Sequence, residues 1–129
     1  MHNVAERLRT GRLAEEYFLA HSQAIASVAP TLILDHRALA RGYDFGIRER
    51  DGIAIEVKGL KQKRGGIAFT DREWSEANVR RGDFWLVVVG NIDTNPIARL
   101  IPDPATSLNA ECRYQTTIAA SWRAMVAVA

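Results

Sequence analysis

Residues 43–59, YDFGIRERDGIAIEVKG, alternate between polar and apolar side chains, turn, and alternate again. This pattern predicts a β-hairpin, in which the side chains of each strand point alternately to two faces. The apolar side chains meet on one face in a single register, because a slip of one residue inverts a whole strand. A three-residue turn at 50–52, with Gly52 suited to a positive φ, gives that register. The apolar face then consists of Tyr43, Phe45, Ile47, Ile53, Ile55 and Val57.

The opposite face of the hairpin carries three charged side chains, Asp44, Glu56 and Lys58, with Gly46 among them. In the predicted register Asp44 lies opposite Lys58 and Gly46 lies opposite Glu56, so the charged groups are about 5 to 8 Å apart. Two carboxylates that converge on open space suit a hard divalent cation such as Mg²⁺, and a lysine beside it can stabilise charge on a phosphate. The alternative is an ordinary cross-strand ion pair between Asp44 and Lys58 on an exposed face.

A helix is predicted at the start of the chain. Asn3 followed by Glu6 is a capping-box signal, and the apolar periodicity continues to about His21. Gly11 inside this helix would allow a close approach to a sheet. The segment TLILDH, residues 31–36, fits either a short strand or a helical turn.

A second helix follows the hairpin. Thr70 and Glu73 form another capping-box signal, and the helix of about ten residues that they begin is expected to end at Gly82. The apolar run at 84–90 predicts a strand that is buried on both faces. Further strands are expected at residues 67–70 and, at an edge of the sheet, at 97–101. The order is therefore αβββαβ, which predicts an α/β (α+β) fold with a mixed sheet flanked by helices, followed by a tail that fits either strand or helix.

Composition predicts a soluble globular protein and excludes several other classes. Apolar residues make up 47% of the chain and charged residues 25%, and 129 residues are enough for a single domain, 1–129, with its own core. Cys112 is the only cysteine, which excludes an internal disulfide and favours a cytoplasmic location. No signal-peptide core and no apolar run of about 20 residues occurs, so a membrane protein is not expected. The histidines lack metal-ligand spacing, which argues against a zinc site.

Several segments resemble a known family. "GYD…IEVKG" followed by a Thr-x-x-Glu-Trp helix is similar to the bipartite signature of the PD-(D/E)XK nuclease superfamily. More narrowly, four segments resemble the domain found at the C-terminus of NO VEIN-type proteins. These segments are GRLAEEYFLA (11–20), GYDFGIRERDGIAIEVKG (42–59), FTDREWSEAN (69–78) and GDFWLVVV (82–89). The similarity extends over nearly the whole chain and implies a restriction-endonuclease-like αβββαβ core.

The resemblance implies a metal-dependent phosphodiesterase site. Asp44 and Glu56 match the metal-binding acids, Lys58 matches the signature lysine, and the backbone carbonyl of Val57 would be a further ligand of Mg²⁺ or Mn²⁺. The superfamily often has another glutamate on the first helix, and Glu15 fits that position. Its neighbour Glu16 points about 100° away.

Basic residues lie directly beyond the proposed site. Lys61, Lys63 and Arg64 are expected to bind phosphates of a nucleic acid, and the alternative is a solvated charged loop. Thr70 and Glu73 are explained as a helix cap, and the resemblance adds an accessory role near the site.

The leading hypothesis from the sequence is a Mg²⁺-dependent endonuclease that acts on DNA, with RNA as the alternative substrate. Cutting two strands requires two sites, so a homodimer is expected. A second hypothesis is a catalytically inactive module that keeps the nuclease-like fold and binds nucleic acid or a protein partner. A third hypothesis is a purely structural interaction domain, in which the charged face of the hairpin only interacts with solvent.

Overall fold

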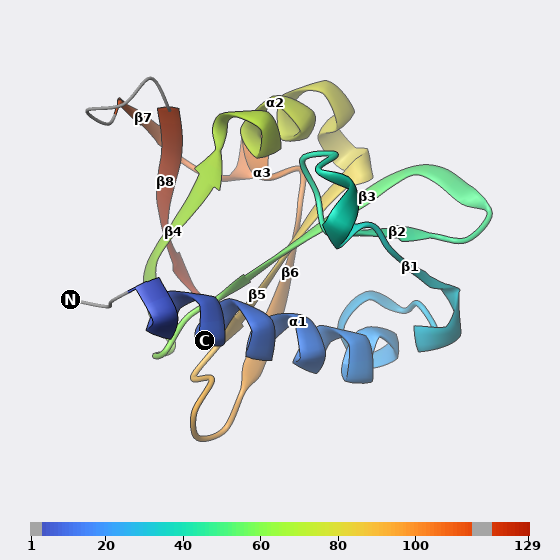
Figure 1. Cartoon of the computed structure of the whole chain (residues 1–129), viewed down its shortest axis with the longest axis horizontal. Helices are drawn as coiled ribbons and strands as arrows, with labels where there is room; N and C mark the ends of the chain where they lie inside the picture. Colours follow the sequence, from blue (N-terminus) through green and yellow to red (C-terminus); the bar gives the residue numbers. More distant parts are fainter. Residues whose placement is uncertain (1–3, 115–119) are drawn as a thin grey trace.

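A mixed five-stranded sheet lies at the centre of the fold in the computed structural model, which describes residues 4–114 and 120–129 (Figure 1). Its strand order is β1-β2-β3-β5-β6; β3 and β5 are parallel, and the other neighbours are antiparallel. The strands are β1 (Ile33–Asp35), β2 (Phe45–Ile47), β3 (Arg50–Gly59), β5 (Phe84–Gly90) and β6 (Ile97–Pro102). The predicted α/β (α+β) class with a mixed sheet is confirmed, and β6 is an edge strand as expected.

A second, antiparallel sheet has the order β4-β8-β7. Its strands are β4 (Arg64–Thr70), β7 (Glu111–Tyr114) and β8 (Ala120–Ala127). The strand predicted after the hairpin therefore begins earlier, at Arg64, and it pairs with β8 rather than with the central sheet. The tail that could not be assigned from sequence supplies β7, β8 and the short helix α3 (Pro104–Ser107).

The two longer helices differ in how well the sequence predicted them. Helix α1 (Val4–Ala26) continues past His21, whose φ of −125° and ψ of 20° are not helical, and the predicted cap residue Asn3 lies outside the described residues. Helix α2 (Asp71–Arg80) begins with the predicted capping box, but Arg81, with φ of 54°, ends it in place of Gly82. Within residues 4–114 and 120–129, none of the helices combines the length and the hydropathy that a bilayer-spanning helix requires.

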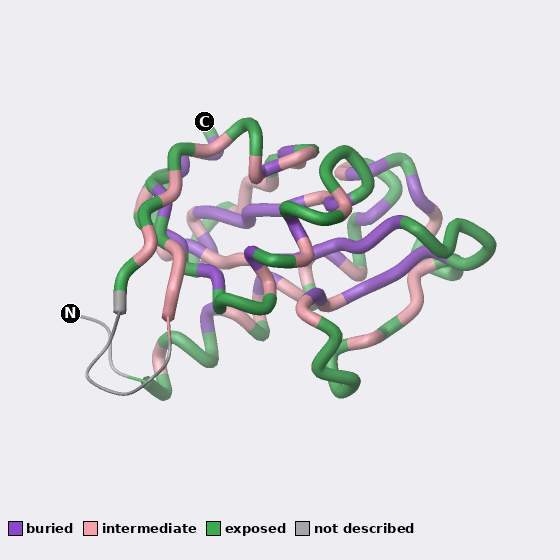
Figure 2. Tube along the Cα trace, turned by 90° about the horizontal axis from the view of Figure 1, so that it is seen from above, coloured by how far each residue is buried: buried purple, intermediate pink, exposed green. Residues whose placement is uncertain are grey.

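Both faces of the central sheet are covered, and Figure 2 shows buried residues along its middle strands. Strand β5 contributes to both cores because its side chains alternate between the faces, which confirms the prediction of a strand buried on both sides. One core contains Ala14 and Phe18 of α1 together with Phe45, Ile47, Ile53, Ile55, Val57, Val87 and Val89. The other core lies under α2 and the second sheet and contains Tyr43, Ala54, Phe69, Trp74, Ala77, Leu86, Val88 and Ala124.

The hairpin turns earlier than predicted. Ile47 pairs with Arg50 and Phe45 pairs with Ile55, so the loop consists of residues 48–49 and the predicted turn at 50–52 is wrong. Glu49 takes the positive φ of 67° that the prediction gave to Gly52. The register shifts between Phe45 and Ile47, and this irregularity invalidates a prediction that assumed an unbroken ladder.

The first arm of the hairpin is also shorter than expected. Tyr43 precedes β2 and packs in the core opposite to that of Phe45, so the two residues do not share a face. Gly46 pairs with Leu34 of β1, and a Cβ on Gly46 would lie 2.9 Å from Cε1 of His36. The missing side chain therefore leaves room for the His36 ring and not for a ligand between the charged groups.

Helix α1 packs closely against β3 at Gly59. A Cβ on Gly59 would lie 2.7 Å from the carbonyl oxygen of Thr10 and 3.0 Å from Cβ of Ala14. Gly11 is not the residue that permits this approach, because a Cβ on Gly11 has no neighbour within 4 Å among the described residues. The glycine that matters for the contact is on the strand and not on the helix.

Substituting the two glycines should have opposite effects on stability. Gly59→Ala inserts a methyl group against helix backbone and is expected to lower the free energy of unfolding by about 1 to 3 kcal/mol. Gly11→Ala removes a helix-weakening residue at an open position and is expected to raise it by about 1 kcal/mol. Urea unfolding followed by circular dichroism measures both changes. A Gly59→Ala protein as stable as the wild type would contradict the close packing of α1 on β3.

Candidate functional site

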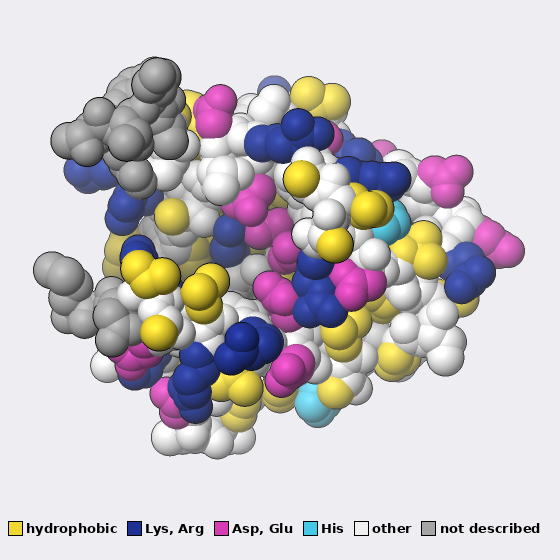
Figure 3. Space-filling model, viewed as in Figure 1, with side chains coloured by type: hydrophobic (Ala, Val, Ile, Leu, Met, Phe, Trp, Pro, Cys, Tyr) yellow, Lys and Arg dark blue, Asp and Glu magenta, His cyan; other side chains and the backbone are white. Residues whose placement is uncertain are grey.

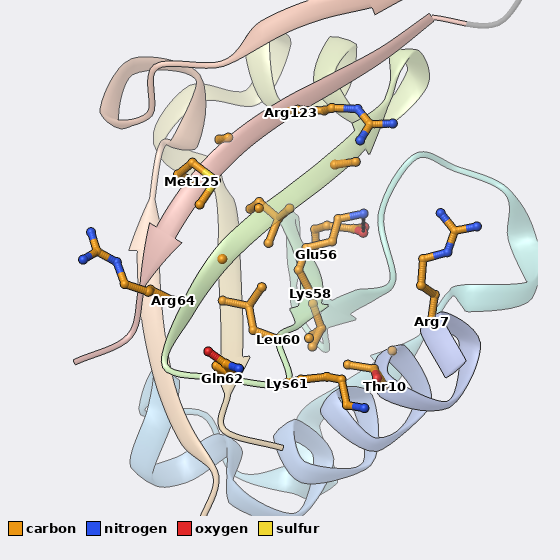
Figure 4. Close-up of a pocket in the computed structure, with 18 of the residues that line it drawn as sticks. Arg7, Thr10, Glu56, Lys58, Leu60, Lys61, Gln62, Arg64, Arg123 and Met125 are labelled. Atoms are coloured by element: carbon orange, nitrogen blue, oxygen red, sulfur yellow. Dashed lines mark ion pairs between the residues drawn. The ribbon is translucent and has the colours of Figure 1, made fainter. Parts of the chain in front are cut away.

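A cleft of about 1520 Å³ opens between α1 and the second sheet (Figure 4). Its lining includes the end of β3, the facing side of α1, and residues of β4 and β8. Figure 3 shows acidic side chains gathered in the hollow near the middle of the molecule, with Lys and Arg side chains around them. The lining includes Asp44, Glu56 and Lys58 together with Glu15 and Glu73.

Asp44 lies just before β2 and is held by three backbone contacts. Its N–H donates to the carbonyl oxygen of Ile55 at 3.0 Å, and its carbonyl accepts from the N–H of His36 at 2.9 Å. Its side-chain Oδ2 accepts from the N–H of Val57 at 3.0 Å. These contacts place the Asp44 carboxylate at the backbone N–H of Val57. The predicted position of Asp44 directly opposite Lys58 is therefore wrong.

Burial raises the pKa of Asp44 to about 6. The hydrogen bond from the Val57 N–H opposes this rise, and the negative charges of Glu15 and Glu73 add to it. Asp44 therefore stays ionised at neutral pH at a cost in folding free energy, as is common for carboxylates at functional sites.

Glu56 is the most deeply buried charged side chain of the site, with 2% of its surface exposed. Its Oε2 lies 3.0 Å from Nζ of Lys58, and its Oε1 is buried with no hydrogen-bond partner among the described residues. Burial raises the pKa of Glu56 well above its usual value, and the charges of Asp44 and Glu73 contribute while Lys58 opposes the rise. One oxygen of a buried carboxylate is thus available to a ligand.

Lys58 lies between two carboxylates. Its Nζ is 3.0 Å from Oε2 of Glu56, 2.9 Å from Oε1 of Glu73, and 5.3 Å from the centre of the Phe69 ring. Burial alone would lower the pKa of Lys58, but the two carboxylates outweigh it and raise the pKa above its usual range. The side chain is therefore an ammonium group at neutral pH and cannot accept a proton from water.

Glu73 connects the start of α2 to this lysine. Its Oε1 accepts from the backbone N–H of Thr70 at 2.9 Å and from Nζ of Lys58 at 2.9 Å. In return, the N–H of Glu73 donates to Oγ1 of Thr70 at 3.1 Å, which completes the capping box. The sequence predicted the cap and an accessory role for both residues, but no signal in it indicated the ion pair between Glu73 and Lys58.

Glu15 lines the cleft from α1, whereas Glu16 is exposed and does not belong to the lining. The carboxylate of Glu15 forms an ion pair with Arg37 at 2.9 Å. Arg37 is itself held by Asp35, with 2.6 Å between Nη2 and Oδ2. Sequence reasoning missed Arg37, which directly follows the segment 31–36 that could not be assigned to an element.

The three basic residues predicted to bind phosphates do not act as one group. Lys61 and Arg64 line the cleft, and Lys63 does not. Lys61 forms an ion pair with Glu6 and lies 4.0 Å from Oδ2 of Asp93, so its charge is partly neutralised.

The chemistry of the carboxylates in the cleft can be compared with what a divalent cation requires, which is oxygen ligands. Within the part of the chain that the structure describes, no group of three or more His, Cys, Asp or Glu side chains is arranged to hold a metal ion. Mg²⁺, however, often takes only one or two protein carboxylates and keeps several waters. Asp44 and Glu56, the latter with its unpartnered Oε1, fit such a site, and Lys58 already neutralises the other Glu56 oxygen.

The fold and the site together define a mixed α+β domain with a buried carboxylate–lysine cluster at the base of a cleft. The family model described as "Protein NO VEIN, C-terminal" matches residues 12–101, and the chain belongs to this family. Neither the curated proteins nor the solved structures contain a match. The matched range includes the whole cluster, whereas β7 and β8 lie beyond its end.

The raised pKa of Asp44 makes the free energy of unfolding depend on pH. The folded protein holds the proton between about pH 4 and pH 6 while the unfolded chain releases it, so this group lowers stability as pH rises through that window. Ionised Asp44 costs the folded state about 3 kcal/mol above pH 6. Asp44→Asn keeps an acceptor for the Val57 N–H and removes this cost.

Asp44→Asn is therefore expected to stabilise the protein near neutral pH, by up to about 3 kcal/mol, and this gain should shrink as pH falls towards 4. Urea unfolding at several pH values measures the difference from the wild type. Asp51→Asn, at an exposed position of β3, is the matched control and should show no such pH dependence. A gain that stays constant from pH 4 to pH 8 would show that ionisation of Asp44 is not its source.

Proposed function

We propose that this protein is a metal-dependent nuclease of the PD-(D/E)XK type that hydrolyses phosphodiester bonds in DNA. The observation that carries the proposal is the state of Glu56, a carboxylate with 2% exposure and an unpartnered Oε1, beside Asp44 and in contact with Lys58. A buried polar atom without a partner is costly, and a purely structural ion pair would satisfy both carboxylate oxygens. The same burial argues against an ordinary ion pair on an exposed strand.

Asp44 and Glu56 are the residues that would hold the cation, with the Val57 carbonyl and Glu15 as additional candidates. A bound Mg²⁺ supplies Lewis acidity, because it lowers the pKa of a coordinated water and neutralises charge on phosphate oxygens. Lys58 remains an ammonium group, so its role is to orient water or to stabilise negative charge on the phosphate. General-base catalysis by Lys58 is inconsistent with its raised pKa.

Glu73 is a positioning residue in this proposal. Glu73 and Glu56 both form an ion pair with the Lys58 ammonium group, so the ammonium group is not paired with Glu56 alone. Without the charge on Glu73, Lys58 would pair only with Glu56 and compete with a cation for that carboxylate. Cleavage of both strands of a duplex would require two such sites, and the proposal includes a homodimer, which light scattering can test.

The direct test is cleavage of labelled DNA in the presence of Mg²⁺ or Mn²⁺, with linear, nicked, branched and single-stranded substrates. Lys58→Ala, Asp44→Ala and Glu56→Gln are each expected to reduce the cleavage rate by about 10² to 10³, because each removes a group that acts on the transition state or holds the cation. Asp51→Asn is the control and should cleave like the wild type.

Circular dichroism of each variant establishes that it is folded. Cleavage that survives Lys58→Ala would refute the assigned site. A wild-type protein that binds DNA in a salt-dependent way but cleaves none of the substrates would instead identify the inactive nucleic-acid-binding module.

The effect of Glu73 on Lys58 can be tested separately from its part in the capping box. Glu73→Gln keeps a side chain that suits the capping box and removes the charge, so it is expected to raise the Mg²⁺ concentration for half-maximal cleavage by about tenfold or more. Thr70→Ala removes the hydroxyl of the cap and leaves the Lys58–Glu73 pair. It is expected to cost about 1 kcal/mol of stability with a smaller change in Mg²⁺ dependence. Equal Mg²⁺ dependence in the two variants would show that Glu73 acts only through the helix.

A further inference from the structure

Two arginines extend into the cleft region from opposite walls, outside the acidic cluster. Arg7 lies on α1 and Arg123 lies on β8, and both are exposed residues of the cleft lining. Among the described residues, neither side chain has an ion pair or a hydrogen-bond partner, whereas Arg37 and Arg80 are paired with carboxylates. Both guanidinium groups are therefore available to bind an anion from solution.

The close-up view distinguishes these arginines from Arg64, which also belongs to the cleft lining. In Figure 4, Arg7 reaches from α1 and Arg123 from β8 towards the same space beside Glu56 and Lys58, while Arg64 points away from it. The two positive charges thus come from the two walls of the cleft, and the acidic cluster itself repels a free anion. An anionic ligand that binds both arginines has to carry negative charge near each of the two walls.

A phosphodiester chain has this property. It carries a negative charge at each nucleotide, and the planar guanidinium group binds two phosphate oxygens at once. The cleft volume of about 1520 Å³ exceeds the roughly 300 to 1000 Å³ of small-molecule sites, which favours a polymer over a mononucleotide. Met125, 73% exposed and also part of the lining, offers an apolar contact to a sugar or base beside Arg123.

The two arginines do not belong to the part of the chain that matches the family. Arg7 precedes the matched range of residues 12–101 and Arg123 follows it, while Asp44, Glu56 and Lys58 lie inside it. The matched part therefore supplies the acidic cluster together with Lys61 and Arg64, and the flanking segments of this chain add Arg7 and Arg123 to the walls.

We infer that Arg7 and Arg123, one on each wall of the cleft that contains the Asp44–Glu56–Lys58 cluster, bind phosphates of a DNA strand that crosses the cleft. This inference rests on the proposed function, since it assigns the substrate path of the same site. Arg64 contributes less, because its guanidinium points away from the cluster. The walls, rather than the base of the cleft, then set how tightly DNA is bound.

The test is binding of labelled single-stranded and duplex DNA, followed by fluorescence anisotropy over a range of salt concentrations, with EDTA present so that no cleavage occurs. Arg7→Ala and Arg123→Ala are each expected to weaken binding several-fold and to reduce the slope of log K against log salt by about 0.7 to 0.9. Arg12→Ala, an exposed position of α1 that is not in the cleft lining, changes the net charge equally and should leave the slope unchanged.

Each outcome bears on the inference separately from the proposed nuclease activity. If Arg7→Ala and Arg123→Ala lose no more affinity than Arg12→Ala, the inference is wrong even when the wild type cleaves DNA. If both variants lose affinity but the wild type cleaves nothing with Mg²⁺ or Mn²⁺, the inference stands and the nuclease proposal fails. Tighter binding of RNA than of DNA of the same sequence would overturn the assignment to DNA.

Discussion

The burial of the Lys58 ammonium group between the carboxylates of Glu56 and Glu73 is the constraint on which the other features depend. Buried ion pairs add little net stability, because desolvation offsets most of the Coulomb attraction. This network leaves Oε1 of Glu56 without a partner among the described residues, and burial raises the pKa of the neighbouring Asp44. Apolar side chains would pack this space at lower cost, so folding stability does not explain the network, and this agrees with the proposed role of the cleft.

The surrounding architecture keeps these charges in fixed positions. Strand β3 contributes Glu56 and Lys58, and the N-terminus of α2 contributes Glu73, so the ion pairs join the central sheet to the helix that packs on it. Helix α1 lies against β3 at Gly59 and forms one wall of the cleft. The second sheet forms the other wall, and its strands β7 and β8 come from a segment beyond the family match.

Much of the fold was readable from local patterns. The capping box at Thr70 and Glu73, the strand at 84–90 and the edge strand near 97–101 were all predicted, as were the inward faces of Ile55 and Val57. The errors concern positions where a non-local contact competes with a local preference. His36 occupies the space beside Gly46, and α1 approaches Gly59 rather than contacting the sheet through Gly11.

The sequence by itself determined which side chains of β3 share a face and where α2 begins, because alternation and capping depend on neighbours along the chain. It therefore indicated that Asp44, Glu56 and Lys58 lie near one another. Only the tertiary structure decided that Glu73 contacts Lys58, that Arg37 contacts Glu15, and that Arg7 and Arg123 reach the cleft from opposite walls. Those distances depend on how helices and sheets pack, and packing is set by the whole core rather than by any local pattern.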